Sequence, residues 1–285
     1  MIDFINYLNA KGFSKNTLES YVRDINLYVI FCNKMGIEIY SKNSIYKYFS
    51  YLKSKKLQES SLKRKKASLL AFSKFLSVQG KEKILDSDTV RFKDKKKLPS
   101  YLKTKEVRAI LDSFNVKEDL EYRDFFIVFF LFSTGIRVSE LINIMSSDID
   151  IKERIVKIRG KGNKERLVVL TESLASEYQI YYDRFKHIID KIGYLFFNNR
   201  GKKITRRGVE FIFERIYKNN SNALSYKKFH PHVLRHSYAT ALIENGADIR
   251  YVAETMGHAS LDTTEKYTHV SIKKLRDAYM YHPHA

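Results

Sequence analysis

Histidine and arginine gather in one short stretch, residues 230–240, which reads HPHVLRHSYAT. Three of the chain's 8 histidines stand within seven residues there, beside Arg235. Such side chains could hold a metal ion, could bind a phosphate, or could belong to a polar helix that has no site. The spacing of these residues and the rest of the chain distinguish the three interpretations.

A metal site fits this stretch poorly. His232 and His236 are four residues apart and would share a helix face. A zinc-protease helix of the H-E-x-x-H type needs glutamate directly after the first histidine, where this chain has Val233. No third ligand stands nearby, and Arg235 would repel a cation. The single cysteine, Cys32, excludes a multi-cysteine zinc site, so we predict no metal and no other cofactor.

The spacing of His232 and Arg235 suits a phosphate instead. They are three residues apart, so on a helix both side chains could reach one anion. A guanidinium binds two phosphate oxygens with paired hydrogen bonds, and an imidazole donates or transfers a proton. The start of a polar helix gives the same pattern, so this hypothesis depends on partners elsewhere in the chain.

Two distant segments supply such partners. Upstream, STGIRVSEL places Arg137 just after a buried helix, on a turn that the core would hold. Downstream, ETMGHASLDTTEKYTHV ends a helix at Gly257 and places His258 in the turn that follows. Ser260 can then cap a helix that carries Tyr267. The chain thus offers a second arginine, another histidine and a tyrosine.

Four motifs resemble those of the tyrosine recombinase family, close to its Xer group. TGIRVSEL is similar to the family's first arginine motif, GKGNKER to its catalytic-lysine turn, HPHVLRHSYAT to its H-x-x-R motif, and MGHASLDTTEKYTHV to its histidine-then-tyrosine motif. The gaps also fit, being 24 residues from Arg137 to Lys161, three from His232 to Arg235, 23 to His258 and nine to Tyr267. The resemblance covers about residues 101–281, and the N-terminal helices resemble the family's core-binding domain only in pattern.

The resemblance implies a role for each motif residue. Tyr267 would attack a DNA phosphate to give a 3′-phosphotyrosine and a free 5′-hydroxyl. Arg137 and Arg235 would bind the non-bridging oxygens, and in phosphoryl transfer a single arginine contributes roughly 10³–10⁵ in rate. Lys161 would protonate the departing 5′-oxygen as a general acid.

The remaining polar residues of the motifs receive supporting roles. His232 and His258 would hydrogen-bond the phosphate or help to move the proton of the tyrosine, whose pKa of about 10 makes help necessary. Glu140 would orient Arg137 rather than take part in the chemistry. His230 and His236 would pack or form local hydrogen bonds.

The charge of the chain predicts a polyanionic partner. The formal net charge is +20, with 52 basic and 32 acidic residues. Residues 1–98 hold 21 basic against 9 acidic residues, and the rest of the chain holds 31 against 23, so both parts are basic. Nucleic acid is the leading candidate, because no basic stretch accompanies an exposed apolar stripe that a membrane surface would bind.

Several other classes of protein are disfavoured. There is no G-x-x-x-x-G-K-[ST] loop, so ATP is not expected, and Asp148 and Asp150 resemble cap or turn residues rather than magnesium ligands. The longest apolar run, residues 125–132, is shorter than the roughly 20 residues of a membrane span. One cysteine and a start without a signal-peptide pattern predict a cytoplasmic protein.

Periodicity predicts a mainly α-helical chain with a small antiparallel β-sheet. Helices are predicted over residues 17–32, 44–55, 60–80, 104–114, 122–135 and 204–218. Apolar residues recur at helical spacing in 17–32 and 60–80, and the apolar run in 122–135 predicts a buried helix. The strands RIVKIRG and ERLVVL flank the turn GKGNK. Thr104 and Thr205 are expected to cap helices, Ser173 to open one, and Gly36 and Gly135 to end two.

We expect two domains that close around the duplex as a C-shaped clamp. Residues 1–88 would form a SAM-like helical core-binding domain, and residues 89–100, which include RFKDKKKLP, a linker. Residues 101–285 would form the tyrosine-recombinase catalytic domain. Its amphipathic tail SIKKLRDAYMYHPHA would dock on a neighbouring protomer, as in Xer relatives, or pack within its own subunit.

Two basic groups are candidate DNA contacts. One is the run Lys63, Arg64, Lys65 and Lys66, whose alternative is a solvated helix face. The other is Arg206 and Arg207, at the start of a helix where the recognition contacts of the family fall. Arginine pairs bidentately with guanine in the major groove, and contact with phosphates alone is the alternative for this second group.

The function implied by the resemblance is site-specific recombination through a 3′-phosphotyrosyl intermediate, in chromosome partition and dimer resolution at a dif-like site. The partners would be double-stranded DNA and further copies of the chain, as a dimer on one site and a tetramer in synapsis. A second recombinase or an activating DNA translocase are further candidates. A type IB topoisomerase has a similar catalytic domain, but the tail argues against it. The six candidate residues together argue against a non-catalytic DNA-binding protein.

Overall fold

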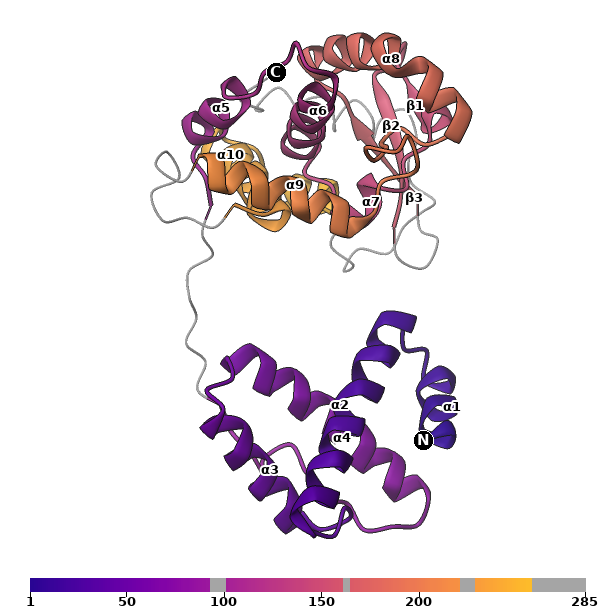
Figure 1. Ribbon diagram of the computed structural model, residues 1–285, viewed down its shortest axis with the longest axis vertical. Helices are drawn as coiled ribbons and strands as arrows, with labels where there is room; N and C mark the ends of the chain where they lie inside the picture. The colour runs from indigo at the N-terminus through magenta and orange to yellow at the C-terminus, as the bar shows by residue number, and fades with distance from the viewer. Residues whose placement is uncertain (93–100, 161–164, 221–228, 258–285) are drawn as a thin grey trace. The chain divides into compact units, whose positions relative to one another are not determined.

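The computed structural model describes residues 1–92, 101–160, 165–220 and 229–257, and Figure 1 shows how these form helices and strands. The chain divides into two compact units, residues 1–97 and residues 98–285. Each unit has its own hydrophobic core. Within the described ranges, no helix combines the length and the apolar character that crossing a membrane requires.

The described part of the N-terminal unit consists of four helices and the segments that join and follow them. Its helices are α1 (Ile2–Ala10), α2 (Lys15–Met35), α3 (Lys42–Ser54) and α4 (Glu59–Val78). The hydroxyl oxygen of Ser14 accepts the N–H of Thr17 at 3.4 Å where α2 begins, and Gly36 ends that helix with φ 61°. This confirms the predicted stop of α2. Helix α1 escapes prediction because its nine residues bury only Phe4 and Leu8, too few to define a period.

The second unit is built around one buried helix, α6 (Asp119–Thr134). Its other helices are α5 (Thr104–Asp112), α7 (Val138–Leu141), the 3₁₀ turn η1 (Ser146–Asp148), α8 (Glu172–Ile192), α9 (Arg206–Asn219), α10 (Pro231–Glu244) and α11 (Ile249–Thr255). Helix α6 contacts α5, α8 and α10 (Figure 1). Most of its residues are buried. The apolar run FFIVFFLF makes such burial favourable on every side of the helix.

A small antiparallel sheet completes this unit. Its strands are β1 (Ile149–Asp150), β2 (Ile155–Arg159) and β3 (Glu165–Val169), in the order β1-β2-β3. Arg159 lies opposite Glu165 at the end of the β2–β3 ladder. The two longer strands confirm the predicted hairpin, and the two-residue strand β1 is too short to carry a period. The fold is therefore mainly helical with a small antiparallel sheet, as the sequence predicts.

Two predicted helix starts are wrong by one residue. Helix α5 begins at Thr104, so Lys103 is its N-cap rather than Thr104, and the Lys103 N–H donates to Glu106 at 2.7 Å. Helix α8 begins at Glu172 rather than Ser173, because Thr171 is the cap and its hydroxyl accepts the N–H of Leu174 at 3.2 Å. A side chain still satisfies a free N–H group at each start, that of Glu106 in α5 and that of Thr171 in α8.

Gly135 is the turn that sets the direction of the chain after α6. Its φ is 61°, in the left-handed region that favours glycine. A Cβ placed there would lie 2.2 Å from the ring of Tyr238 on α10. Only glycine allows α10 to pack this closely, and the turn leads directly to Arg137.

Candidate active site

Arg137 stands at the junction between the buried helix and the short helix α7. It is the N-cap of α7, with extended backbone, and its side chain is 38% exposed. Because α6 and the Gly135 turn are fixed by the core, the position of the Arg137 backbone is fixed as well. The sequence prediction that the core holds this turn is confirmed.

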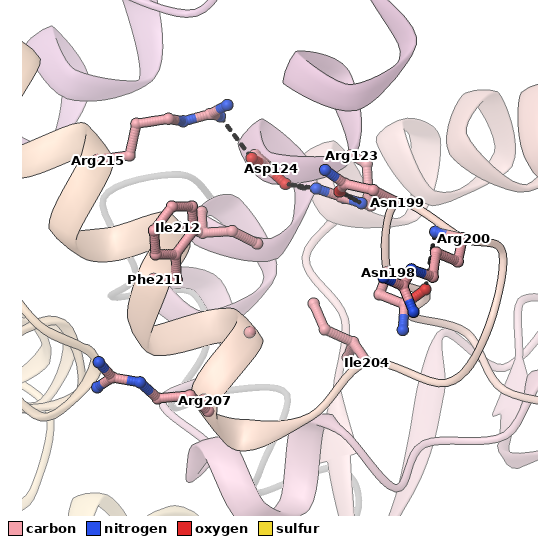
Figure 2. A pocket seen from close by; sticks show the side chains of 11 residues that line it. Arg123, Asp124, Asn198, Asn199, Arg200, Ile204, Arg207, Phe211, Ile212 and Arg215 are labelled. Atoms are coloured by element: carbon pink, nitrogen blue, oxygen red, sulfur yellow. Dashed lines mark hydrogen bonds and ion pairs between the residues drawn. The ribbon is translucent and has the colours of Figure 1, made fainter.

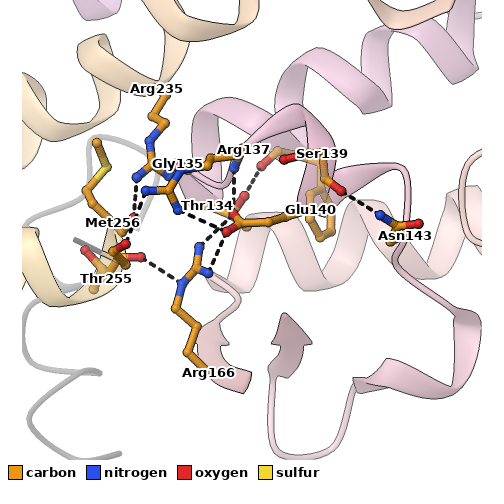
Figure 3. A network of polar contacts seen from close by, with 12 residues as sticks. Thr134, Gly135, Arg137, Ser139, Glu140, Asn143, Arg166, Arg235, Thr255 and Met256 are labelled. Carbon is orange, nitrogen blue, oxygen red and sulfur yellow. Dashed lines mark hydrogen bonds and ion pairs between the residues drawn. The ribbon is translucent and has the colours of Figure 1, made fainter. Parts of the chain in front are cut away.

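Glu140 binds Arg137 through both its backbone and its side chain. One carboxylate oxygen accepts the backbone N–H of Arg137 at 2.7 Å, and the other accepts its guanidinium at 3.1 Å (Figure 3). Glu140 is therefore placed to orient Arg137, as the resemblance implies. Its side chain is only 4% exposed, so its charge is shielded from solvent.

A third residue, Arg166 on β3, completes this network. Its guanidinium donates to both carboxylate oxygens of Glu140 at 2.9 Å, and Arg166 lies opposite Arg137 across that carboxylate (Figure 3). Burial alone would raise the pKa of Glu140, but the hydrogen bonds and charges of Arg166 and Arg137 outweigh burial and lower that pKa. Glu140 is therefore a carboxylate at neutral pH.

Arg235 approaches the same region from α10. Its guanidinium donates to the carbonyl oxygen of Gly135 at 2.5 Å and to that of Met256. The residue is 7% exposed. Burial first, and then the charge of Arg137, lower the pKa of Arg235 to about 10, so it stays a cation at neutral pH.

The two predicted phosphate-binding arginines thus converge on the end of α11. Arg137 donates to the carbonyl oxygen of Gly257 at 3.1 Å, one residue after the carbonyl that Arg235 binds. Arg137, at the start of α7, and Arg235, on α10, are about 100 positions apart in the chain and meet at one place (Figure 3). Their combined positive charge is suited to an anion such as a phosphate.

His232 shares a pocket with Arg137. The pocket has a volume of about 460 Å³, and its lining includes Arg137, His230, His232 and, from α9, Arg206 and Glu210. The geometry therefore brings together an arginine and a histidine from two motifs, as expected for a phosphate site.

The other two histidines of the stretch have local contacts. The ring of His236 lies edge-on to Tyr101, with centroids 6.2 Å apart, and that of His230 is edge-on to His232 at 6.3 Å. Local packing of His236 is what the sequence predicts. Lys161, His258 and Tyr267 lie outside the described residues, so their roles stay predictions.

Arg206 and Arg207 lie at the start of α9 and face solvent. Their side chains are 63% and 77% exposed. Both pair with Glu210 on the next turn, Arg206 at 2.9 Å and Arg207 at 3.7 Å. Surface ion pairs of this kind are worth roughly 0–1 kcal/mol, so a nucleic-acid phosphate or base could displace them.

The basic run on α4 is corrected at one position. Lys65 is 7% exposed, and its ammonium donates to Asp24 on α2 at 3.0 Å. Arg64 also pairs with Asp24, while the ammonium of Lys66 donates to the backbone of Ser87 at 2.5 Å. A buried carboxylate needs such partners, and Lys65 is therefore not a surface ligand for DNA. The run is neither wholly a solvated face nor wholly a DNA contact.

Asp148 and Asp150 behave as the predicted cap and turn residues. Asp148 accepts the N–H of Met145 at 2.9 Å and pairs with Arg159, while Asp150 accepts the N–H of Glu153 at 3.0 Å.

A second ion-pair network was not predicted. The carboxylate of Asp124 on α6 is buried between Arg123 and Arg215, with contacts of 2.6 Å and 2.5 Å, beside a pocket of about 430 Å³ (Figure 2). Arg215 comes from α9, so the network joins α9 to the buried helix. Arg166 was not predicted either, because an arginine beside a glycine-rich turn looks solvated in the sequence.

Comparison with known proteins identifies the family. Residues 100–274 match the phage integrase family, and residues 1–80 match the N-terminal SAM-like domain of phage integrases. The chain is 35% identical over 300 residues to tyrosine recombinase XerC of Listeria welshimeri serovar 6b, which covers 99% of this chain and 97% of that protein. It is 35% identical over 291 residues to XerC of Staphylococcus haemolyticus, with 100% and 97% covered.

Solved structures agree with this match. XerH recombinase bound to difH substrate, in a pre-cleavage complex, is 26% identical with a TM-score of 0.63, covering 84% of this chain and 70% of that one. The Tn1549 transposon integrase in complex with circular intermediate DNA shares the fold at 20% identity, with a TM-score of 0.71 and 99% and 94% covered. The chain therefore belongs to the phage integrase family and is a tyrosine recombinase, an enzyme that cleaves and rejoins DNA strands.

Proposed function

We propose that the chain is a site-specific recombinase that resolves chromosome or plasmid dimers at a dif-like site through a 3′-phosphotyrosyl intermediate on Tyr267. The observation that carries the proposal is the convergence of Arg137 and Arg235 on the carbonyl groups of residues 256 and 257. The chain continues from there into His258 and, nine residues later, Tyr267. The XerC relatives and the XerH structure with difH substrate support the choice of site.

The proposed chemistry needs positive charge around the scissile phosphate. The side chain of Arg137 is exposed enough to bind a non-bridging oxygen, and the buried Arg235 supplies a second cation. Arginine hydrogen bonds made in a region of low dielectric stabilise transition-state charge strongly. His232 lines the same pocket as Arg137 and would hydrogen-bond the phosphate or move a proton.

Bond breaking and rejoining then follow without ATP or metal. The phenolic oxygen of Tyr267 gives its proton to His232 or His258 and forms a bond to phosphorus. The bond to the 5′-oxygen breaks, and Lys161 supplies the proton which that oxygen takes. Attack by a 5′-hydroxyl on the phosphotyrosine reverses these steps on the same or a partner strand. The phosphate ester bond is exchanged rather than hydrolysed, so no further energy source is needed.

Double-stranded DNA is the proposed partner, together with further copies of the chain, as a dimer on one site and a tetramer in synapsis, in the cytoplasm. Residues 1–88 would bind DNA through Lys63, Arg64 and Lys66, and residues 101–285 would bind it through Arg206 and Arg207. Residues 89–100 would link the two. A second recombinase or a DNA translocase would be an additional partner.

A covalent capture experiment tests this proposal. The full-length protein is incubated with sheared genomic DNA of its source, the mixture is denatured, and DNA attached to protein is sequenced. We expect one short sequence to be enriched with the wild type and none with Tyr267→Phe. Adducts spread without sequence preference, together with relaxation of any supercoiled plasmid, would instead indicate a topoisomerase.

A further inference from the structure

We propose that Arg166 is a positioning residue for strand cleavage. It holds Glu140 so that Arg137 keeps hydrogen-bond donors for the scissile phosphate, and it fixes the segment that leads to His258. This inference rests on the proposed function, because it assigns a residue to the same cleavage step. Arg166 itself is not proposed to touch the DNA.

Each of the three guanidinium nitrogens of Arg166 donates one hydrogen bond. Two of its nitrogens donate to the two carboxylate oxygens of Glu140, both at 2.9 Å, and its Nε donates to the carbonyl of Thr255 at 3.3 Å. The side chain is 10% exposed. Bidentate pairing with a carboxylate fixes the plane of a guanidinium, so this group is held more rigidly than a surface arginine.

Arg166 limits how strongly Glu140 can bind Arg137. Each Glu140 oxygen already accepts one N–H from Arg166 and one from Arg137, the latter from its backbone and from its side chain. Arg137 therefore has one side-chain contact with the carboxylate, at 3.1 Å, rather than a bidentate pair. A guanidinium has five N–H donors, so donors of Arg137 remain for a phosphate.

Without Arg166, the same carboxylate would have open acceptor sites directly beside Arg137. A buried carboxylate that loses one cation binds the remaining one more tightly, because it has few other partners. We infer that Arg137 would then turn toward Glu140 and away from the phosphate. The loss would fall on the cleavage step, in which the phosphate gains charge on its oxygens.

Arg166 also joins three segments that carry motif residues. It belongs to β3, and Lys161 stands in the sequence between that strand and its antiparallel partner β2. Through Glu140 it reaches Arg137, and through Thr255 it reaches the end of α11. Gly257 packs against it so closely that a Cβ there would lie 3.2 Å from its guanidinium carbon.

The Asp124 network supplies a matched control. Asp124 is a buried carboxylate of the same unit held by two arginines, Arg123 and Arg215, just as Glu140 is held by Arg137 and Arg166 (Figures 2 and 3). Arg215→Gln removes one arginine and leaves the other, as Arg166→Gln does. The described contacts of Arg215 are with Glu121 and Asp124, neither of which binds Arg137 or α11.

The test compares Arg166→Gln, Arg166→Lys and Arg215→Gln in the full-length protein. The probe is a nicked duplex with the sequence captured by the wild type. Single-turnover adduct formation gives the cleavage rate, a gel shift gives the Kd, and thermal unfolding gives the stability. We expect Arg166→Gln to cleave about 10²-fold more slowly, the effect of a misplacement of about 1 Å, with a Kd within about threefold of wild type.

The two other variants separate positioning from general destabilisation. Arg166→Lys keeps the charge but not the bidentate geometry, so it should recover part of the rate. Arg215→Gln should cleave at a rate within about threefold of wild type, even if it lowers the Tm as much as Arg166→Gln does. If Arg166→Gln does not fold, the cleavage rate of Arg166→Lys is compared with that of Arg215→Gln. A slower rate in Arg166→Lys supports the inference, and an equal rate overturns it.

Three outcomes overturn the inference. They are a cleavage rate of Arg166→Gln within threefold of wild type, an equal slowing in Arg215→Gln, and a loss confined to the Kd. A wild type that forms no adduct at all would refute the proposed function instead, which is a different result from any of these.

Discussion

Replacing Gly135 by alanine should damage both the fold and the cleavage step. The backbone at Gly135 has φ 61°, and a left-handed conformation costs an L-residue roughly 1–2 kcal/mol. The new Cβ would also lie 2.2 Å from the Tyr238 ring, about 1.3 Å short of an ordinary carbon contact of about 3.5 Å. Overpacking of this kind costs roughly 1–3 kcal/mol more. We therefore expect a loss of about 2–5 kcal/mol of unfolding free energy.

The clash should reach the active site through α10. The ring of Tyr238 is fully buried, so relief requires α10 or the Gly135 turn to move. Helix α10 carries Arg235, which binds the carbonyl of Gly135 itself at 2.5 Å. A shift of about 1 Å between these groups should slow adduct formation by about 10²-fold.

Gly193→Ala is the matched control for this change. Gly193 ends α8 with φ 72°, but among the described residues the nearest atom to a Cβ there is the methyl carbon of Met145, at 4.0 Å. This variant should lose only the unfolding free energy that the left-handed backbone conformation costs, about 1–2 kcal/mol, and should cleave at the wild-type rate. Urea unfolding of the full chain and single-turnover cleavage measure both effects. The reasoning is refuted if the two alanine variants are equally stable and equally active.

Four other predictions follow from the site and the charge. Tyr267→Phe should bind DNA as wild type does but give no shifted band on a denaturing gel, and a persistent band would place the nucleophile elsewhere. Lys161→Ala should cleave about 10²–10⁴-fold more slowly. Sulfur in place of the bridging 5′-oxygen should restore its rate, because a thiolate leaves without a proton, and failure of this rescue would argue against a general acid at Lys161. The lowered pKa of Glu140 should make it stabilise the fold above about pH 4.5 and lose that effect as pH falls through its folded pKa. The stability gap between wild type and Glu140→Gln, measured by urea unfolding, should therefore narrow in acid. If about six phosphates are contacted, the logarithm of the DNA affinity should fall with the logarithm of salt at a slope of roughly −5, and a slope near zero would contradict binding through the basic residues.

The sequence by itself determined the local elements and the identity of the motif residues. Helix ends depend on contacts within a few residues, such as the Ser14 hydroxyl with the N–H of Thr17 or the left-handed turn at Gly135. These contacts are visible in a short stretch of sequence. The predicted helix starts at Thr104 and Ser173 were off by one, because several polar residues near each start could serve as the cap and the sequence does not single out Lys103 or Thr171. The order and gaps of the motifs likewise placed Arg137 and His232 in one site, and both line one pocket.

Only the tertiary structure decided which charged side chains are buried and what holds them. Lys65 and Arg166 both stand in basic stretches that look solvated, yet one pairs with Asp24, 41 residues away, and the other with Glu140, 26 residues away. A periodic pattern gives the face of a helix or strand but not the element that packs against it. The cost of burying a charge is met by a partner that is distant in sequence, so the role of Arg166 becomes visible only where β3, α7 and α11 meet.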